Sequence, residues 1–385
     1  MSKTYSIPKL VPQSVLNKIK FNLSSISGIV EVSTACNLRC SYCFANRPRK
    51  EIMNSYVAAR IIEQLANVNG KSKATKIIWH GGEPLLAGID FYKNVLVIQK
   101  NLESQGFKLH NSMQTNATLL NDEWIDFLRD NKFGVGSSLD GFRDYHNSNR
   151  VDKKGNGTYD QVVSKLLRAK EMGLSIGVIC VINREMIPYV ERIYSEMKQM
   201  GLHFTMSPVT PTHKNGKDLQ PLTPDEYADV LIRLFDLWFN DPTPTIRVNP
   251  PHSVLKGILY GGLPLFCNAD DSCFSKFISF LPDGSVYPCN RFASEPDFIL
   301  GNITYQDLDT ILSNPIREKL LARSKDKLEP CSQCDSNKMC RGGCAHHAYV
   351  FYGNIQNPDY YCRAFFKAFN YYYNNVKENL NLASY

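Results

Sequence analysis

Three cysteines near the start of the chain form its most distinctive chemical pattern. Cys36, Cys40 and Cys43 follow an apolar run and share one short loop, with three and then two residues between them. Thiolates are the usual protein ligands of iron–sulfur clusters, and a [4Fe–4S] cluster takes four ligands. Three thiolates leave the fourth iron open to a small molecule, into which the cluster can pass an electron. The motif therefore predicts a redox-active cluster with an open coordination site.

Eight of the other nine cysteines lie in the last third of the chain. They are Cys267, Cys273, Cys289, Cys331, Cys334, Cys340, Cys344 and Cys362. Eight thiolates suit two further clusters with four ligands each. Structural zinc is the alternative, because a pair of cysteines two residues apart also suits a tetrahedral zinc site. The ninth cysteine, Cys180, lies within an apolar run and is expected to be a buried, inert thiol.

The composition suits a globular enzyme rather than a membrane or nucleic-acid-binding protein. A length of 385 residues with 43% hydrophobic residues fits one large or two modest domains. No run approaches the roughly 18 apolar residues of a membrane span, and the start lacks the apolar core of a signal peptide, so we expect a cytoplasmic protein. The formal charge of +7 moves toward neutrality once cluster-bound thiolates are counted, so no nucleic-acid partner is expected.

Short β-rich runs alternate with helical patterns through the first half of the chain. This alternation implies parallel strands joined by right-handed crossovers. Six strands are too few for an eight-stranded barrel, so the predicted fold is α/β, a partial (β/α)6 barrel. The predicted strands are 29–33, 76–79, 112–115, 134–138, 175–181 and 204–207. The predicted helices between them are 56–65, 92–104, 122–130, 159–171 and 190–200.

Ligands of such barrels collect at the carboxyl ends of the strands. Four unusual segments follow predicted strands there: the cysteine loop, Gly-Gly-Glu-Pro at 81–84, Gln-Thr-Asn at 114–116 and Ser-Leu-Asp-Gly at 138–141. We expect them to form one site. The predicted organisation is an N-terminal segment over 1–27, the barrel over 28–210, a bridging helix and linker over 211–262, and a cysteine-rich domain over 263–385. That domain ends in a helix over 363–380 with a core-facing aromatic stripe.

The cysteine loop, Ala-Cys-Asn-Leu-Arg-Cys-Ser-Tyr-Cys-Phe, and the later cysteine spacing resemble the radical S-adenosylmethionine (SAM) enzymes that carry a SPASM domain. The resemblance implies SAM and three [4Fe–4S] clusters as cofactors, with SAM on the open iron of the first cluster. Its cleavage would give a 5′-deoxyadenosyl radical that takes hydrogen from an unactivated carbon. A flavodoxin- or ferredoxin-type protein would supply the electron. The resemblance assigns Cys267, Cys273, Cys289 and Cys344 to one auxiliary cluster, and Cys331, Cys334, Cys340 and Cys362 to the other.

The same resemblance implies which residues contact SAM. Gly81, Gly82 and Glu83 would lie along the methionine amino group, where glycines let the backbone approach closely. Arg150 could pair with the methionine carboxylate through two hydrogen bonds. The full set of expected SAM contacts is Phe44, Gly81, Gly82, Glu83, Gln114, Ser138, Arg150 and Asn183.

Residues 79–88 and 286–292 resemble the anaerobic sulfatase maturases and related maturases of ribosomal peptides. Sulfatase maturases oxidise a Ser or Cys side chain to formylglycine, and are expected to place an Asp base directly after the third auxiliary cysteine. Here that residue is Asn290, whose amide cannot accept a proton usefully near pH 7. Ala45 also stands where a Tyr is common in that group. The catalytic base is therefore unknown.

These departures favour a different oxidation of a peptide. We expect an oxidoreductase that installs a carbon–carbon crosslink (a cyclophane) between an aromatic ring and the β-carbon of a nearby residue in a precursor peptide. Formylglycine formation and thioether formation are the alternatives. A remote alternative is an iron–sulfur electron carrier, which would not cleave SAM.

Overall fold

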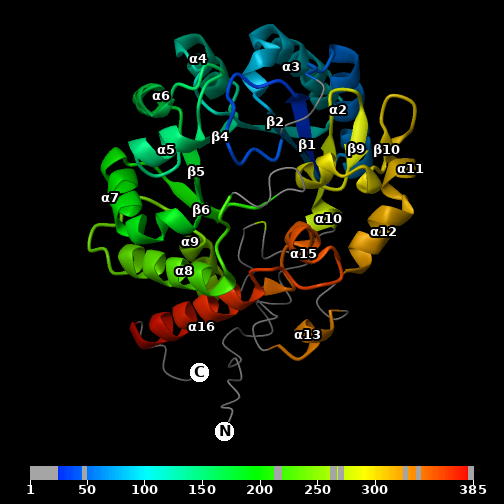
Figure 1. Cartoon of the computed structure of the whole chain (residues 1–385). Helices are drawn as coiled ribbons and strands as arrows, with labels where there is room; N and C mark the ends of the chain where they lie inside the picture. Colours follow the sequence, from blue (N-terminus) through cyan, green and yellow to red (C-terminus); the bar gives the residue numbers. More distant parts are fainter. Residues whose placement is uncertain are drawn as a thin grey trace. The chain divides into compact units, whose positions relative to one another are not determined.

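A computed structural model describes residues 25–45, 50–211, 219–260, 267, 273–323, 328–334 and 340–379 (Figure 1). The predicted N-terminal segment 1–27 lies almost wholly outside them. The chain forms two compact units built from segments distant in sequence. The strand unit comprises Ser24–Cys180 and Phe274–Leu321, and the cysteine unit contains Val181–Cys273 and Ala322–Tyr385. The four predicted domain ranges, 1–27, 28–210, 211–262 and 263–385, stay predictions, because compactness does not test where a domain begins.

The strand unit contains a parallel sheet, which confirms the predicted α/β alternation. Its strands β1 to β5 pair in chain order. They are β1 (Ser27–Ser33), β2 (Ala74–Gly81), β3 (Lys108–Gln114), β4 (Gly134–Ser138) and β5 (Ile176–Ile182). Helices connect them and cover the outer side of the sheet (Figure 1). These are α2 (Ser55–Asn69), η1 (Pro84–Ala87), α3 (Ile89–Ser104), α4 (Asp122–Asp130), α5 (Arg143–Asn149) and α6 (Tyr159–Glu171).

The ends of these helices follow from capping residues in the sequence. The Asn54 side chain accepts a hydrogen bond from the backbone N–H of Val57 at the start of α2. Asn121 does the same for Trp124 at the start of α4. An N-cap side chain satisfies a backbone donor that the helix leaves unpaired, so each Asn fixes where its helix begins.

The two faces of the sheet differ in polarity. Val30 and Trp79 are fully buried on one face, and the Trp79 ring packs against Phe91 and Tyr92 of α3. Side chains alternate along a strand, so the neighbouring residues point to the opposite face. By register, Glu31 lies beside His80 there. Gln114 of β3 and Ser138 of β4 fall on that same face. The polar face therefore carries two of the residues expected to contact SAM.

A second part of the strand unit comes from residues 274–321, where the sequence showed little periodicity. The strand β8 (Phe277–Phe280) pairs in parallel with β1, from Ser27 opposite Phe277 to Val30 opposite Phe280. β9 and β10 extend this edge in antiparallel orientation. The remaining elements are α10 (Cys273–Lys276), β9 (Ser285–Tyr287), η4 (Asn290–Ser294), η5 (Pro296–Phe298), β10 (Gly301–Asn302), α11 (Leu308–Leu312) and α12 (Pro315–Ala322).

The cysteine unit contains the sixth predicted strand and the C-terminal helix. Its elements are η2 (Arg184–Tyr189), α7 (Val190–Met200), β6 (Phe204–Pro208), α8 (Pro224–Phe239), β7 (Val248–Asn249), α9 (Pro251–Tyr260), α13 (Glu329–Ser332), α15 (Ala345–Tyr352) and α16 (Cys362–Asn379). Of the four aromatic residues expected on the core-facing stripe of α16, Phe365, Phe369 and Tyr372 are buried, whereas Tyr373 is only partly buried. The Tyr372 ring stacks on Phe235 of α8 with 4.3 Å between centroids.

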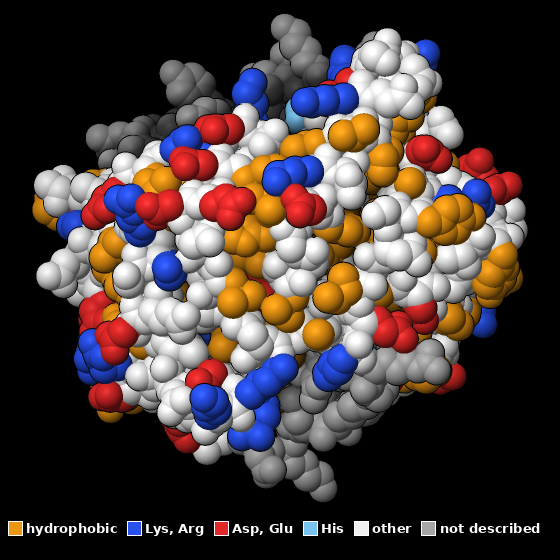
Figure 2. Space-filling model, turned by 90° about the horizontal axis from the view of Figure 1, so that it is seen from above, with side chains coloured by type: hydrophobic (Ala, Val, Ile, Leu, Met, Phe, Trp, Pro, Cys, Tyr) orange, Lys and Arg blue, Asp and Glu red, His pale blue; other side chains and the backbone are white. Residues whose placement is uncertain are grey.

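The surface mixes charges of both signs. Figure 2 shows Lys and Arg side chains interspersed with Asp and Glu over one face of the molecule, around patches of hydrophobic side chains. Among the described residues, no helix combines the length and the apolar character that a bilayer crossing needs.

Candidate active site

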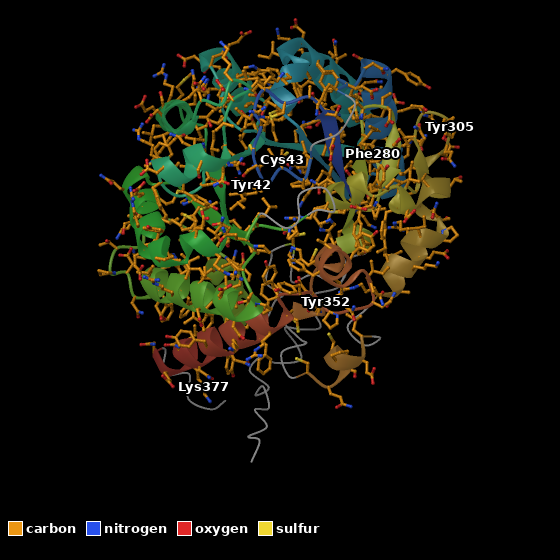
Figure 3. The ribbon with its side chains drawn as sticks, viewed as in Figure 1. Tyr42, Cys43, Phe280, Tyr305, Tyr352 and Lys377 are labelled. Carbon is orange, nitrogen blue, oxygen red and sulfur yellow. The ribbon has the colours of Figure 1, made fainter. Side chains whose placement is uncertain are left out.

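The loop after β1 carries Cys36, Cys40 and Cys43 at the carboxyl end of the strand, and Figure 3 labels Cys43 there. Burial raises the pKa of Cys36 to about 11 and of Cys40 to about 12. A charge on Cys43 raises both values further, so the three thiols lie within electrostatic range of one another. Burial and mutual repulsion both disfavour the thiolate forms of these cysteines. A bound metal cluster stabilises the thiolates, so such thiols lose their protons most readily when a cluster binds. This donor set fits the predicted cluster.

No three described His, Cys, Asp or Glu side chains stand close enough to hold a single metal ion. The thiolates of a [4Fe–4S] cluster bind different irons, so they stand farther apart than the ligands of one ion.

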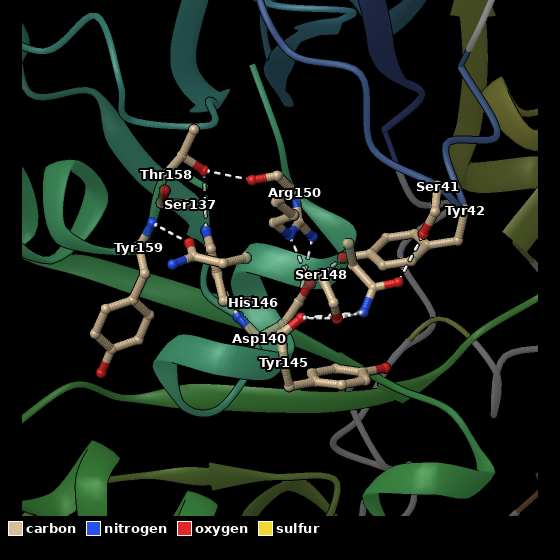
Figure 4. Close-up of polar contacts among 12 residues, drawn as sticks. Ser41, Tyr42, Ser137, Asp140, Tyr145, His146, Ser148, Arg150, Thr158 and Tyr159 are labelled. Atoms are coloured by element: carbon tan, nitrogen blue, oxygen red, sulfur yellow. Dashed lines mark hydrogen bonds and ion pairs between the residues drawn. The ribbon is translucent and has the colours of Figure 1, made fainter. Parts of the chain in front are cut away.

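Backbone contacts hold the cysteine loop against the chain that follows α5. Arg39 N–H donates to the carbonyl of Val151 at 2.8 Å, and Ser41 N–H donates to that of Asn149 at 3.0 Å. The Ser41 hydroxyl also donates to the Asn149 side chain at 2.6 Å (Figure 4). These hydrogen bonds therefore fix the conformation of the cysteine loop against Asn149 and Val151.

A buried ionic network lies behind the loop (Figure 4). Tyr42, between Cys40 and Cys43, donates its hydroxyl to Asp140, which is 0% exposed. Arg150 binds the same carboxylate through Nε at 2.7 Å and Nη2 at 3.4 Å, and its guanidinium lies 5.2 Å from the centre of the Tyr42 ring. The structure thus places the predicted Arg150 in an ion pair with Asp140. Its contact with the SAM carboxylate stays a prediction and would have to use another edge of the guanidinium.

His146 closes this network as a neutral side chain. Its Nδ1 accepts the backbone N–H of Asp140 at 3.2 Å. The Thr158 hydroxyl donates to the carbonyl of Arg150 at 2.8 Å, so His146 Nε2–H must donate to Thr158, 3.1 Å away. Burial lowers the pKa of His146 to about 4, in agreement with that neutral tautomer. The ring fixes the orientation of the segment that carries Asp140.

The two glycines at the end of β2, Gly81 and Gly82, are required by the neighbouring backbone. Gly82 N–H donates to the carbonyl of Ser33 at 2.6 Å. A Cβ on Gly81 would lie 2.2 Å from the Ser33 oxygen, and a Cβ on Gly82 would lie 2.3 Å from the Ala35 oxygen. Such distances exclude any side chain. The close approach of β2 to the start of the cysteine loop therefore requires both glycines, and their contact with SAM stays a prediction.

Glu83 is a fully buried carboxylate that joins two strand ends. Oε1 accepts from the backbone N–H of Leu85 at 3.0 Å and from the hydroxyl of Thr115 at 2.7 Å, and Oε2 accepts from the N–H of Asn116 at 2.8 Å. Burial raises the pKa of Glu83 to about 7, although these hydrogen bonds oppose the rise. The carboxylate therefore ties the end of β2 to the end of β3.

Asn116 links the end of β3 to Cys36, the first cysteine of the loop. Its Nδ2 donates to Cys36 Sγ at 3.7 Å and to Asn37 Oδ1 at 2.9 Å, and the bond to sulfur lowers the pKa of Cys36. Beside it, Gln114 donates from Nε2 to the carbonyl of Ser137 at 2.9 Å. Thus the predicted segments 81–84 and 114–116 do meet the cysteine loop.

The segment that carries Asn290 also reaches this loop. Arg291 lies over the Phe44 ring at 5.3 Å, and Phe44 lies 6.3 Å from His80. Asn290 itself accepts a hydrogen bond from the Cys289 thiol at 3.4 Å. Sequence reasoning missed Arg291 and His80. The alternation of side chains along β2 could have placed His80 on the polar face.

In the cysteine unit, Cys331, Cys334, Cys340 and Cys362 act on one another. Burial raises the pKa of Cys340 to about 12, and the other three thiols add to that rise. Burial likewise raises the pKa of Cys362 to about 11, with Cys331 and Cys334 contributing. Four thiols within electrostatic range of one another fit the ligand set predicted for one auxiliary cluster.

The other predicted ligands are divided between the units. Cys273 and Cys344 are partly exposed and Cys267 is exposed in the cysteine unit, whereas Cys289 belongs to the strand unit. Asn183 directly follows β5, and its buried Oδ1 has no hydrogen-bond partner among the described residues. Cys180 is fully buried, as expected.

Comparisons with known proteins agree with this site. A model of the radical SAM superfamily matches residues 30–197, and a model of an iron–sulfur cluster-binding domain, SPASM, matches residues 273–335. The chain is 30% identical over 355 residues to a cysteine-type anaerobic sulfatase-maturating enzyme of Clostridium perfringens, covering 89% of this chain and 95% of that one. It is 26% identical to a serine-type enzyme of Bacteroides thetaiotaomicron, over 88% and 87% of the two chains.

Solved structures show the same likeness. The native structure of anSMEcpe with bound AdoMet superposes with a TM-score of 0.82 at 26% identity, covering 93% of this chain and all of that one. Streptococcus suis SuiB bound to its precursor peptide SuiA has a TM-score of 0.65 at 18% identity, covering 91% of this chain and 79% of that one, and shares the fold.

Proposed function

Because the chain belongs to the radical SAM maturases with a SPASM domain, the group that includes the anaerobic sulfatase-maturating enzymes, we propose that it oxidises a Cys or Ser side chain of a peptide or protein to formylglycine. The observation that carries this proposal is the loop of three cysteines after β1, whose thiols lie within electrostatic range of one another, in a chain that covers 95% of a cysteine-type sulfatase maturase. This is the function that sequence reasoning gave as an alternative. The comparisons give no specific support to cyclophane formation.

In this proposal, Cys36, Cys40 and Cys43 hold one [4Fe–4S] cluster, and the eight later cysteines hold two more. Bound SAM and the reduced cluster supply a radical that takes hydrogen from the substrate. The chain's own residues position the cluster loop, because the Tyr42 hydroxyl binds the buried Asp140 carboxylate. A flavodoxin- or ferredoxin-type donor delivers the electron, and the substrate lies near the polar face of the sheet.

After hydrogen loss the substrate must still lose one electron, which an auxiliary cluster would accept in this proposal, and one proton from its thiol or hydroxyl. Removal of that proton is the step that the chain's own side chains can control. Asn290 occupies the position expected for the base, and an amide does not accept a proton near pH 7. Its neighbour Arg291 lies over the ring of Phe44 on the cluster loop, which supports a place for this segment at the proposed site. Another group or water must therefore take the proton if the product is formylglycine.

Asn290 is also the observation that favours a second candidate, the carbon–carbon crosslink. There the proton leaves a ring carbon that regains aromaticity, and water can accept it without a side-chain base. Both candidates remove two hydrogens from the substrate overall when the target is Ser or a crosslinked pair. A Cys target loses two hydrogens and then exchanges its sulfur for the oxygen of water, with release of hydrogen sulfide. The two candidates differ in whether a carbonyl group forms.

The test uses anaerobically reconstituted protein, SAM and a reductant. One peptide contains a Cys or Ser target, and a second contains an aromatic residue followed closely by residues that carry a β-carbon, without Cys or Ser. Formylglycine is captured by a hydrazide reagent and identified by mass spectrometry, whereas a crosslink loses two hydrogens, resists capture and gives no fragments between the joined residues. Cys36→Ala should abolish both products. Cys180→Ala is the matched control, because that thiol is buried outside the proposed cluster loops and its loss should leave turnover intact.

Asn290→Asp separates the two candidates further. If formylglycine forms, restoring a carboxylate beside the site should speed it by up to about 10²-fold, the lower end of general-base contributions. Asn290→Ala should give no such increase. If SAM is cleaved but neither peptide changes, both candidates are wrong.

A further inference from the structure

Arg323, at the end of α12, is a buried cation whose contacts are all backbone carbonyls. It is 3% exposed. Nε donates to Ile355 at 2.6 Å, and Nη1 donates to Gly343 at 3.0 Å. Nη2 donates to Gly342 at 3.0 Å and to Asn357 at 2.8 Å. The guanidinium therefore fastens the segment before Cys362 to the two glycines that follow Arg341.

Within the described residues, which leave out 324–327, no carboxylate contacts this guanidinium. Asp359 is also buried in the cysteine unit, but its carboxylate binds other groups. It accepts the N–H of Cys344 at 2.8 Å and that of Tyr361 at 2.8 Å, and it contacts His347 Nδ1 at 2.9 Å. Arginine keeps its charge in proteins, and a buried charge without a counter-ion costs several kcal/mol. Carbonyl dipoles offset part of that cost, so an anion is expected within reach.

The groups that do act on Arg323 include ligands assigned to both auxiliary clusters. Burial lowers its pKa, while Cys344, Asp359, Cys273 and Cys331 oppose the fall. Cys344 and Cys273 belong to one assigned set, and Cys331 belongs to the other. Cys344 stands ahead of Asp359 among these influences. Asp359 therefore supplies part of the balancing negative charge without touching the guanidinium, and the three thiols would add to it when a cluster holds them as thiolates.

Two of the four carbonyls that bind Arg323 lie in the peptide that joins the two assigned sets. Gly342 and Gly343 connect Cys340 of one set to Cys344 of the other. Both glycine carbonyls point to the guanidinium. Any displacement of Arg323 would therefore move the chain between ligands of two clusters.

We propose that Arg323 is the positioning and charge-balancing residue of the auxiliary clusters, a fixed cation that holds the Cys340–Cys344 peptide and favours the reduced state of at least one cluster. This inference rests on the proposed ligation by the eight later cysteines. A [4Fe–4S] cluster with four thiolates carries net negative charge, and reduction adds one electron and one further negative charge. A nearby cation in a low-dielectric interior stabilises that added charge. Arg323 therefore raises the midpoint potential of the cluster.

The test compares Arg323→Met with Arg317→Met. Arg317 is the matched control: it is partly buried and also donates to backbone carbonyls, of Leu312 at 3.0 Å and Phe274 at 3.1 Å, and burial is the sole influence on its pKa. Both changes are made in a background with Cys36, Cys40 and Cys43 replaced by Ala, so that only auxiliary clusters report. Iron and sulfide content, thermal midpoint and EPR-monitored redox titration are measured on anaerobically reconstituted full-length protein.

Arg323→Met should shift the midpoint potential of an auxiliary cluster to more negative values, while Arg317→Met leaves it unchanged. Arg323→Lys keeps the charge but loses carbonyl contacts, so it should load iron and stay closer to the parent potential with a lower thermal midpoint. An unchanged potential in iron-loaded Arg323→Met overturns the proposal. So does an iron-loaded Arg323→Lys whose potential falls as far as that of Arg323→Met, since the charge is then not what matters. Failure of the parent itself to load iron would instead contradict the proposed ligation.

Discussion

Replacing Asp140 with Asn is expected to destabilise the strand unit strongly, because it leaves Arg150 buried beside a neutral partner. The side chains of Arg150 and Asp140 are 10% and 0% exposed, and the guanidinium binds the carboxylate through two nitrogens. Removing one partner of a buried ion pair costs about 3 to 5 kcal/mol. The Asn amide also presents N–H groups to the Tyr42 hydroxyl and to Arg150, which both act as donors.

Asp122→Asn provides a matched control with the same chemistry at the surface. Arg168 binds Asp122 through Nε at 3.1 Å and Nη2 at 2.7 Å, but these side chains are 49% and 58% exposed. Water solvates both groups in the variant, so the expected loss is below about 1 kcal/mol. The two ion pairs have similar hydrogen bonds but differ in burial. The difference between the two losses in free energy of unfolding therefore measures the effect of burial.

The assay is urea denaturation followed by tryptophan fluorescence, since Trp79 and Trp124 lie in the same unit as the network. Iron content after reconstitution is the second measurement. Tyr42 sits between two cluster cysteines, so Asp140→Asn should also lower iron loading, whereas Asp122→Asn should not. If the two variants lose similar free energies of unfolding, the reasoning from buried charge is refuted.

Two further predictions concern the groups beside the first cysteine. Glu83 has a pKa raised to about 7, so its proton stabilises the fold at low pH and that stabilisation is lost as the pH rises toward and through about 7. Between about pH 5 and about pH 8 the free energy of unfolding should fall by about 2 to 3 kcal/mol more than in Glu83→Gln, as pH-dependent urea denaturation would show; parallel curves would contradict this. Asn116→Ala removes the donor to Cys36 Sγ, so the pKa of Cys36 should rise and its alkylation in iron-free protein should slow near pH 8. Peptide mapping after alkylation measures this, and an unchanged rate counts against the hydrogen bond.

The parallel strands and their site loops could be predicted because their signals are local. Apolar alternation marks each strand, and capping residues such as Asn54 and Asn121 mark helix starts. The three cysteines follow directly after a strand, so the topology itself delivers them to the rim. The individual SAM contacts and the domain boundaries stay predictions, and the catalytic base stays unknown.

Other features depend on partners far away in the chain. β8 is only four residues long, and nothing in its sequence indicates which strand it pairs with. Its partner, β1, lies about 250 residues earlier in the chain. The glycines at 81 and 82 were visible, but the carbonyls that exclude a side chain were not. Arg323 directly follows α12 in a polar stretch of the sequence. Because arginine is seldom buried, sequence reasoning would place it at the surface. Its burial arises from loops that close around it.

The pairing of β8 with β1 also bears on how the chain is synthesised. β1 leaves the ribosome early, yet the strand that covers its outer edge comes from Phe277–Phe280, far toward the C-terminus. At usual translation speeds that edge waits on the order of ten seconds or longer for its partner. During that interval an unpaired, apolar strand can associate with other nascent chains. A truncation before β8 would make this transient exposure permanent, so such a fragment should aggregate rather than serve as a free-standing module.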